Sequence, residues 1–401
     1  MTPRETALIG ADIYDGNAVH SDAALLVRAD GSVAITAADA VPEGCAVRRL
    51  DGGIIAPGFV DLQVNGGGGV MFNDAQTAQT LQIMAQAHAT TGTAALLPTL
   101  ITDTPARTRA AIDAVARAID EKVPGIIGIH LEGPHLSVAR KGAHDASLIR
   151  AMTDADMAVF LDAADRLANV MLTVASENVR DDQIAQLAQA GVIVSLGHTD
   201  ASFDRCMSAF DAGARCATHL FNAMSQLGSR EPGLVGAALT HPGASAGLIA
   251  DAIHVHPATM QAALAAKMAA AKGAPGRIFL VTDAMATGGC DLQEFTLNGR
   301  TVRREKGRLT LEDSTLAGAD LNFGRWSSQS SGRSGWGKRA GRRCDGDVDP
   351  GGFVARRYGL WADRRVGKWP CSSGQDHPAA TADCILFDLR KRGSKSKAVE
   401  K

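Results

Sequence analysis

Strand-like and helix-like segments alternate along most of this chain, and this alternation limits the folds that it can adopt. Short apolar runs recur with room for a helix between most of them, and they cover residues 53–63, 93–100, 126–131, 170–174, 192–197, 215–219, 246–250 and 277–282. Strands separated by helices of about 10–15 residues are typical of βαβ units in a parallel sheet. With close to eight such strands, the pattern favours an α/β fold, a closed (β/α)₈ TIM-type barrel, over an open doubly wound sheet.

Composition and the N-terminal residues narrow the class of protein. The 401 residues carry a formal charge of -2, and no uninterrupted apolar stretch approaches the ~20 residues of a membrane helix. We therefore expect no nucleic-acid partner and no membrane partner. The N-terminus lacks the basic and apolar regions of a secretory signal, and seven irregularly spaced cysteines argue against a disulfide framework. A cytoplasmic enzyme is the expectation.

Local composition divides the chain into segments. Residues 1–55 contain short strand-like runs and turns, and with a strand-like run at about 380–390 they predict a small β-sandwich domain built from the N- and C-terminal segments. Residues 56–321 carry the barrel pattern, and residues 391–401 form a basic tail. Residues 322–380 contain all four tryptophans and many arginines, glycines and serines, with no regular apolar spacing.

Four acidic or metal-binding side chains follow strand-like runs: Glu132, His198, His219 and Asp283. The carboxyl ends of parallel strands meet at one mouth of a barrel, so these side chains are expected to lie together. One glutamate, two histidines and a nearby aspartate suit a hydrolytic metal centre with three ligands, an open position for water, and a base. The alternatives are a solvated glutamate, core histidines, and an aspartate that caps a helix. His130 precedes its strand end and is interpreted as a packing or supporting residue.

A series of motifs extends this pattern along the chain. They are Pro-Gly-Phe-Val-Asp-Leu-Gln-Val-Asn-Gly (57–66), Leu-Pro-Thr-Leu (97–100), His-Leu-Glu-Gly-Pro (130–134), Lys-Gly-Ala-His (141–144), Gly-His-Thr (197–199), Thr-His-Leu-Phe-Asn-Ala-Met (218–224), Arg-Glu-Pro-Gly (230–233), Asp-Ala-Ile-His (251–254), Val-Thr-Asp-Ala (281–284) and Leu-Ala-Gly (316–318). In order and spacing they resemble the N-acetylglucosamine-6-phosphate deacetylase family of the amidohydrolase superfamily.

The resemblance implies a metal-dependent deacetylase acting on a phosphorylated amino sugar. The reaction would convert N-acetyl-D-glucosamine 6-phosphate to D-glucosamine 6-phosphate and acetate. Many amidohydrolases hold a second metal on a His-x-His pair, but here the equivalent positions are the amides Gln63 and Asn65. We therefore expect one divalent ion, held by Glu132, His198 and His219. Zinc is the expected ion, and iron, manganese or cobalt would suit the same ligands.

The resemblance also implies roles for the remaining site residues. Asp283 would take a proton from the attacking water and deliver one to the departing amine. Arg230 would bind the phosphate through two parallel N–H bonds. The other expected substrate contacts are Ala143, His144, Asn222, Ala223, His254, Leu316, Ala317 and Gly318. A homodimer or homotetramer is the implied assembly.

Residues 322–380 depart from the family pattern, in which helices complete the barrel before a final β segment. Sequence of this composition is typical of translation in a wrong reading frame, and the strand-like run at 382–388 fits a second, compensating shift. A divergent insertion, or a basic arm that binds an anionic partner, is the alternative. The frame hypothesis predicts loss of the last barrel strand and of its bracing helices, and so a poorly folded or inactive chain.

Two other functions stay open at this point. One is a different amidohydrolase reaction, on a cyclic amide or a purine. The other is a non-catalytic barrel that serves as an assembly or regulatory module. Metal content and the effect of Arg230→Ala on phosphorylated substrates would separate the three.

Overall fold

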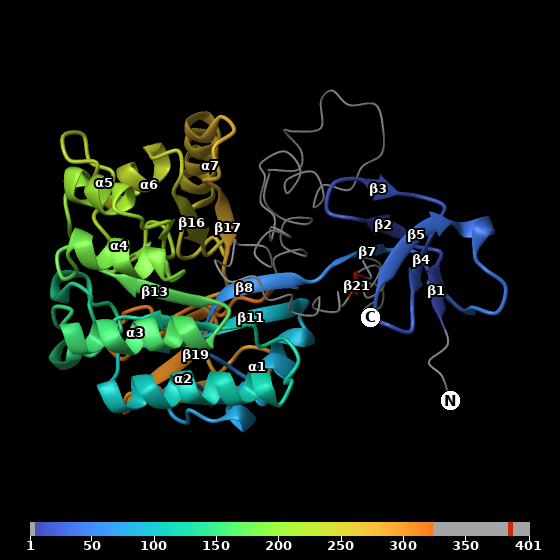
Figure 1. The fold of residues 1–401 in the computed structure, drawn as a ribbon, viewed down its shortest axis with the longest axis horizontal. Helices are drawn as coiled ribbons and strands as arrows, with labels where there is room; N and C mark the ends of the chain where they lie inside the picture. Colours follow the sequence, from blue (N-terminus) through green and yellow to red (C-terminus); the bar gives the residue numbers. More distant parts are fainter. Residues whose placement is uncertain (1–4, 324–383, 388–401) are drawn as a thin grey trace, which may run out of the picture. The chain divides into compact units, whose positions relative to one another are not determined.

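The computed structural model describes residues 5–323 and 384–387, and these residues form two compact units (Figure 1). The first unit comprises the N-terminal strands up to Phe59 together with the strand β21 (Cys384–Phe387), and the second begins at Val60. None of the helices in these two ranges combines the length and apolar character needed to cross a membrane.

The smaller unit is built from two four-stranded sheets. Their strands are β1 (Thr6–Ile9), β2 (Asp12–Tyr14), β3 (Val19–His20), β4 (Ala23–Val27), β5 (Val33–Ala37), β6 (Ala46–Arg49), β7 (Ile54–Pro57) and β21. One sheet has the order β5-β4-β1-β6 and the other β21-β7-β2-β3. Ile13, Leu25 and Ile55 come from both sheets and share one apolar core. The predicted β domain, built from both ends of the chain, is confirmed.

The larger unit contains eight parallel strands in a nearly closed barrel, as predicted. They are β8 (Phe59–Val64), β11 (Thr93–Ile101), β12 (Ile129–Glu132), β13 (Val170–Val174), β14 (Ile193–Leu196), β15 (Cys216–Ala217), β16 (Ser245–Leu248) and β17 (Ile278–Leu280), each paired with the next. The chain just past β17 returns to β8, where the Asp283 amide donates to the Gln63 carbonyl at 3.0 Å. First and last strands therefore meet.

Seven α-helices alternate with these strands in the described ranges. They are α1 (Ala78–Ala89), α2 (Pro105–Asp120), α3 (Asp154–Arg166), α4 (Asp181–Gln189), α5 (Phe203–Asp211), α6 (Gly233–Thr240) and α7 (Pro257–Ala271). Several begin at a hydroxyl side chain that accepts from the first helical turn, as Thr153 does at α3. The apolar faces of the helices pack on the outside of the sheet around residues such as Leu131, Leu172 and Val194.

The structure corrects one expectation about residues 322–380. β17 is already the eighth strand of the barrel, so the last strand is not lost with that segment. β15 and β17 fall within the runs at 215–219 and 277–282, so the sequence already contained all eight strands, and the expected loss followed only from the family pattern. Residues 324–383 and the helices expected there lie outside the described residues, so the reading-frame hypothesis stays a prediction.

The inside of the barrel is layered, because alternate residues of a strand share a face. The layer nearer the amino ends of the strands is apolar, and it includes Leu97, Met171, Ile193, Cys216 and Val281. Two residues further along the same strands come the polar residues Thr99, Thr173, Ser195, Thr218 and Asp283, all buried. The side chains inside the barrel thus change from apolar to polar toward the carboxyl ends of the strands, where a polar site can form.

Candidate metal centre and active site

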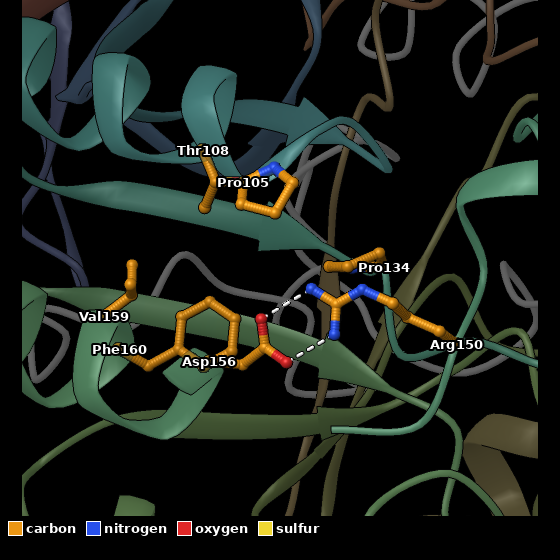
Figure 2. Close-up of a pocket in the computed structure, with 7 residues that line it drawn as sticks. All are labelled: Pro105, Thr108, Pro134, Arg150, Asp156, Val159 and Phe160. Carbon is orange, nitrogen blue, oxygen red and sulfur yellow. Dashed lines mark hydrogen bonds and ion pairs between the residues drawn. The ribbon is translucent and has the colours of Figure 1, made fainter. Parts of the chain in front are cut away.

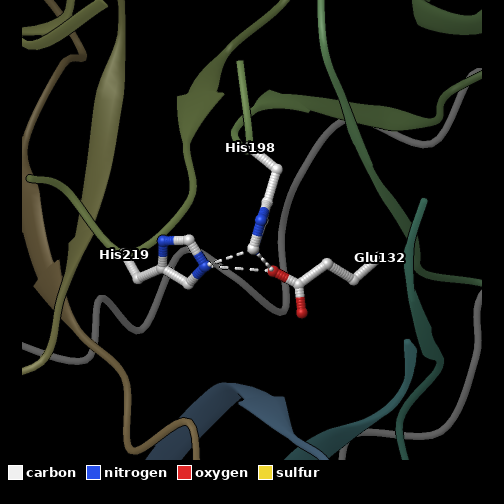
Figure 3. Close-up of side chains that lie close together, drawn as sticks. All are labelled: Glu132, His198 and His219. Carbon is white, nitrogen blue, oxygen red and sulfur yellow. Dashed lines mark hydrogen bonds and ion pairs between the residues drawn. The ribbon is translucent and has the colours of Figure 1, made fainter. Parts of the chain in front are cut away.

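Glu132, His198 and His219 meet at the carboxyl ends of β12, β14 and β15 (Figure 3). Nε2 of His198 lies 3.1 Å from Nε2 of His219, and these nitrogens lie 3.3 and 3.1 Å from Oε1 of Glu132. All three side chains are buried. The sequence prediction that these distant residues come together is confirmed in geometry.

The hydrogen bonds around His198 show that the cluster fits a metal ion. Nδ1 of His198 lies 2.7 Å from the carbonyl oxygen of Arg140, which can only accept, so Nδ1 carries the proton. In the neutral ring, Nε2 then directs a lone pair at the Glu132 carboxylate. The three ligand atoms lie close enough together to bind one cation. A buried Glu-His-His set of this kind fits a single divalent metal ion.

The backbone at the site adopts a conformation that non-glycine residues rarely take. His198, His219 and Asp283 have φ values of 46°, 29° and 51°, in the left-handed region. Such residues cost about 1–3 kcal/mol each and cluster at functional sites. The left-handed turns end the strands at the point where these side chains reach the mouth.

Asp283 is buried beside the cluster, because Nε2 of Gln63 contacts both Asp283 and Glu132. Its backbone amide donates to the carbonyl of Gln63 in β8, and its own carbonyl accepts from the Ala319 amide at 2.9 Å. Burial, followed by the negative charge of Glu132, raises the pKa of Asp283 to about 6. A carboxylate with a pKa close to neutrality can both accept and return a proton near pH 7.

A chain of buried hydroxyl groups lies beneath the cluster, and the sequence analysis did not predict it. Oγ1 of Thr218 lies 2.7 Å from Oγ1 of Thr173 and 2.7 Å from Oγ of Ser195. Nε2 of His130 lies 2.7 Å from Oγ1 of Thr173. The supporting role expected for His130 fits this contact, because His130 and Thr218 stand on the strands that carry Glu132 and His219. Each of the three hydroxyl residues lies two positions after an apolar one on its strand, and this pattern in the sequence could have revealed the chain of hydroxyl groups.

A second missed group closes the barrel below the site. Asp61 is fully buried and accepts hydrogen bonds from the backbone amide and Oγ1 of Thr282, at 3.2 and 2.5 Å. Burial raises the pKa of this carboxyl to about 7. Asp61 thereby ties the first strand to the residue that precedes Asp283. One feature of the sequence indicates that Asp61 belongs near the site, because Asp61 lies two residues before Gln63 and so on the same face of the strand.

His144 lies beside the metal cluster, as expected for a substrate contact. Its ring centroid is 4.4 Å from that of His198. Nδ1 of His144 lies 2.8 Å from Oγ1 of Thr102 and 3.3 Å from the backbone nitrogen of the same residue, so Thr102 fixes the orientation of the ring. Burial lowers the pKa of His144 to about 3, which keeps the ring neutral. His144 can therefore donate a hydrogen bond without carrying charge.

A three-stranded sheet after β17 supports the loop that carries His144. Its strands are β18 (Glu294–Leu297), β19 (Arg300–Glu305) and β20 (Arg308–Thr310). The Arg300 guanidinium donates to the carbonyl oxygen of Ala143. Gly142 has a φ of 54°, and a Cβ there would lie 3.3 Å from the His198 ring. The loop therefore approaches the metal cluster as closely as its glycine allows.

The other expected substrate contacts fall into two groups. Gly318 lies against the Asp283 segment, because a Cβ on it would come within 2.8 Å of the Asp283 carbonyl, and Leu316 and Ala317 precede it. His254 is tied by its Nδ1 to Asp251 at 2.7 Å. Their roles stay predictions.

Asn222 and Ala223 lie in the tight turn that follows His219. Nδ2 of Asn222 already donates to the carbonyl oxygens of His219 and Leu220, at 3.2 and 3.3 Å. Arg230 is exposed, and no ion pair links it to another residue in the described part of the chain. Its guanidinium is thus available to a ligand, and its phosphate role stays a prediction.

Two hollows elsewhere in the larger unit are not lined by the metal cluster. Figure 2 shows the smaller one, where the Arg150 guanidinium lies along the Asp156 carboxylate beside Pro134 and Phe160. Its volume of about 10 Å³ would hold at most one water molecule. The larger hollow, of about 640 Å³, contains Arg180 and Arg205, whose charges are paired with aspartates. Neither suits a sugar phosphate.

Comparison with known proteins agrees with the fold and the site. The sequence model of the amidohydrolase family matches residues 54–314. An N-acetylgalactosamine-6-phosphate deacetylase from Shewanella sp. (strain ANA-3) is 46% identical over 275 residues, 69% of this chain and 68% of that protein.

Solved structures give the same result. The N-acetylglucosamine-6-phosphate deacetylase of Pasteurella multocida has a TM-score of 0.76 and 32% identity, with 89% of this chain and 90% of that chain covered. A mutant of the Mycobacterium smegmatis enzyme, in complex with N-acetyl-D-glucosamine-6-phosphate, has a TM-score of 0.73 and 30% identity, with 89% and 91% covered. With the barrel and its buried Glu-His-His cluster, these matches show that the chain belongs to the amidohydrolase family.

Proposed function

We propose that this chain is a hydrolase that deacetylates N-acetyl-D-glucosamine 6-phosphate to D-glucosamine 6-phosphate and acetate. The observation that carries the proposal is the buried cluster of Glu132, His198 and His219, with Asp283 held beside Glu132 by the shared Gln63 amide. The names of the relatives, all deacetylases of an N-acetylhexosamine 6-phosphate, support the choice of reaction.

The chain's own residues would divide the chemistry as follows. Glu132, His198 and His219 hold one divalent ion, for which zinc is proposed. When bound, the ion supplies Lewis acidity, which polarises an amide carbonyl and lowers the pKa of water from about 15.7 toward about 7. Asp283 accepts the proton of the attacking water and returns it to the amine that leaves. The ring of His144, whose centroid is 4.4 Å from that of His198, contacts a substrate oxygen in this proposal.

N-acetyl-D-galactosamine 6-phosphate is a second candidate substrate. A specific observation favours it, since the relative at 46% identity is named for that sugar, whereas the Pasteurella multocida enzyme is 32% identical. The two sugars differ only in the configuration of one ring hydroxyl, which the metal cluster does not need to contact.

The test is an assay of acetate release by the purified chain, with both sugar phosphates and added divalent ions. We expect release from at least one of them, and almost none from the Asp283→Asn variant. No release from either sugar by a folded, metal-loaded chain would exclude the function. The sugar phosphate with the higher kcat/KM is then the preferred substrate.

A further inference from the structure

The two positions that replace a His-x-His pair hold amides whose nitrogens donate to carboxylates of the site. Gln63 and Asn65 stand at the end of β8, and their side chains are only 2% and 1% exposed. Nε2 of Gln63 donates to both oxygens of Glu132 at 3.3 Å, and to Oδ1 of Asp283 at 3.2 Å. The Gln63 amide thus lies between two carboxylates.

Asn65 adds the shortest contact to Asp283. Its Nδ2 donates to the same oxygen, Oδ1, at 2.7 Å. The direction of this bond is settled by chemistry, because an ionised carboxylate only accepts and an amide nitrogen only donates. In the described ranges, Oδ2 of Asp283 has no hydrogen bond. One oxygen of Asp283 is therefore anchored twice, and the other is left available.

The contact between Asn65 and Asp283 also has a cost in free energy that the packing around Asn65 does not offset. With its nitrogen turned to Asp283, Asn65 leaves Oδ1 buried and without a hydrogen-bond donor among the described residues. An unsatisfied buried acceptor costs about 1–3 kcal/mol, and such groups in native proteins call for an explanation. An apolar side chain would avoid the cost, which indicates that the amide at position 65 serves the site.

We propose that Gln63 and Asn65 are positioning residues for Asp283, which fix Oδ1 and leave Oδ2 as the oxygen that handles the proton. The inference rests on the proposed deacetylase function. The oxygen of the attacking water bonds to the carbonyl carbon as its O–H bond breaks and the proton moves to Oδ2. The same proton then passes to the amine nitrogen as the C–N bond breaks, which releases acetate and the amino sugar. The Gln63 amide also lies between Glu132 and Asp283.

The experiment removes each donor without a large change of volume, by Asn65→Leu and Gln63→Met. We expect kcat to fall about 10–100-fold, as for other groups that orient a catalytic side chain, with KM within about threefold. Metal content should stay near one equivalent in Asn65→Leu, because Asn65 does not contact the metal cluster.

A matched control is available at Asn73, another buried amide that donates to a carboxylate. Its Nδ2 bonds the Ile101 carbonyl and Asp103 Oδ2, both at 3.1 Å, away from the metal cluster. Asn73→Leu should lower Tm and leave kcat within twofold of the wild type. If Asn65 has only a structural role, Asn65→Leu will behave like Asn73→Leu, with a lower Tm and an unchanged kcat.

A double mutant tests whether the amides act through Asp283. In the Asp283→Asn background, Asn65→Leu should cause no further loss of kcat, because the group that it positions is gone. A crystal structure of Asn65→Leu should show the carboxylate of Asp283 rotated. A normal kcat, an additive loss in the double mutant, or an unmoved carboxylate would each overturn the inference. If the wild type releases no acetate, the proposed function is wrong. The crystal structure of Asn65→Leu would still show whether Asn65 positions Asp283.

Discussion

Nε2 of His219 lies 3.1 Å from Nε2 of His198 and 3.1 Å from Oε1 of Glu132, so both imidazoles converge on one carboxylate. A divalent ion between these atoms would accept an electron pair from each of them. The Arg140 carbonyl, which binds Nδ1 of His198, therefore helps to select the tautomer that a metal ion requires.

We expect the purified chain to bind about one equivalent of a divalent ion through this cluster. His219→Asn should lower the bound metal well below that value, because only two ligands would remain. Elemental analysis measures the content, and His20→Asn in the small unit is the control. A chelator should also lower the Tm of the wild type, since a ligand of the folded state stabilises it. Equal metal in His219→Asn and wild type would contradict the assignment.

Asp283→Asn should lower kcat about 10²–10⁴-fold, the usual contribution of general acid–base catalysis. The substitution keeps the shape of the side chain and the metal ligands, so the metal content should not change. Steady-state rates of acetate release, compared at equal metal loading, measure the effect. A variant with more than half of the wild-type kcat would remove Asp283 from the reaction.

The pH dependence follows from the raised pKa of Asp283, about 6. Asp283 accepts a proton only when it is ionised, so kcat should fall as the pH drops through about 6, and level off above it. A bound cation favours the ionised carboxylate and would move this limb to lower pH. Measurements of kcat against pH at fixed metal saturation test the direction of this change. A rate that rises as the pH falls below 6 would be incompatible with this role.

Thr218→Val should destabilise the protein by about 1–3 kcal/mol, because it leaves the hydroxyl groups of Thr173 and Ser195 without their shared partner in a buried layer. Thr218→Ser keeps the hydroxyl and is the control. Urea unfolding gives the free energy of unfolding of each variant. If Val and Ser variants are equally stable, the hydroxyl chain has no role in stability.

Arg230→Ala should raise KM for the sugar phosphate about tenfold or more, since hydrogen bonds to a charged group contribute about 1.5–3 kcal/mol. The unphosphorylated N-acetylated sugar serves as the comparison, because it offers the guanidinium no anion. Its kcat/KM should be unchanged. Equal losses for both sugars would show that Arg230 supports the loop rather than the phosphate.

The metal ligands were predictable because they depend on only one feature of the fold. Glu132, His198 and His219 each follow an apolar strand, and parallel strands bring their carboxyl ends together whatever the intervening helices do. The small β domain was predictable for a similar reason, since turn residues separate its short strands.

The supporting groups were less accessible to sequence reasoning. The partner of His198 is a backbone carbonyl at Arg140, and a carbonyl is present at every residue, so sequence gives no sign of it. Thr218 and Ser195 resemble ordinary strand residues until their side chains are placed in one ring. Gln63 and Asn65 were recognised only as lost metal ligands, because the pattern shows which ligand is missing and not which hydrogen bonds replace it.

The pairing of β21 with β7 has a consequence for how the chain is made. β7 is synthesised well before its neighbour Cys384–Phe387, because the barrel lies between the two in the sequence. At about 5–20 residues per second, translation of the whole barrel separates the two. Until then β7 is an open sheet edge of the nascent chain, and open edges invite pairing with other chains. Neighbouring nascent molecules on one messenger therefore have an open edge at Ile54–Pro57 through which they can pair.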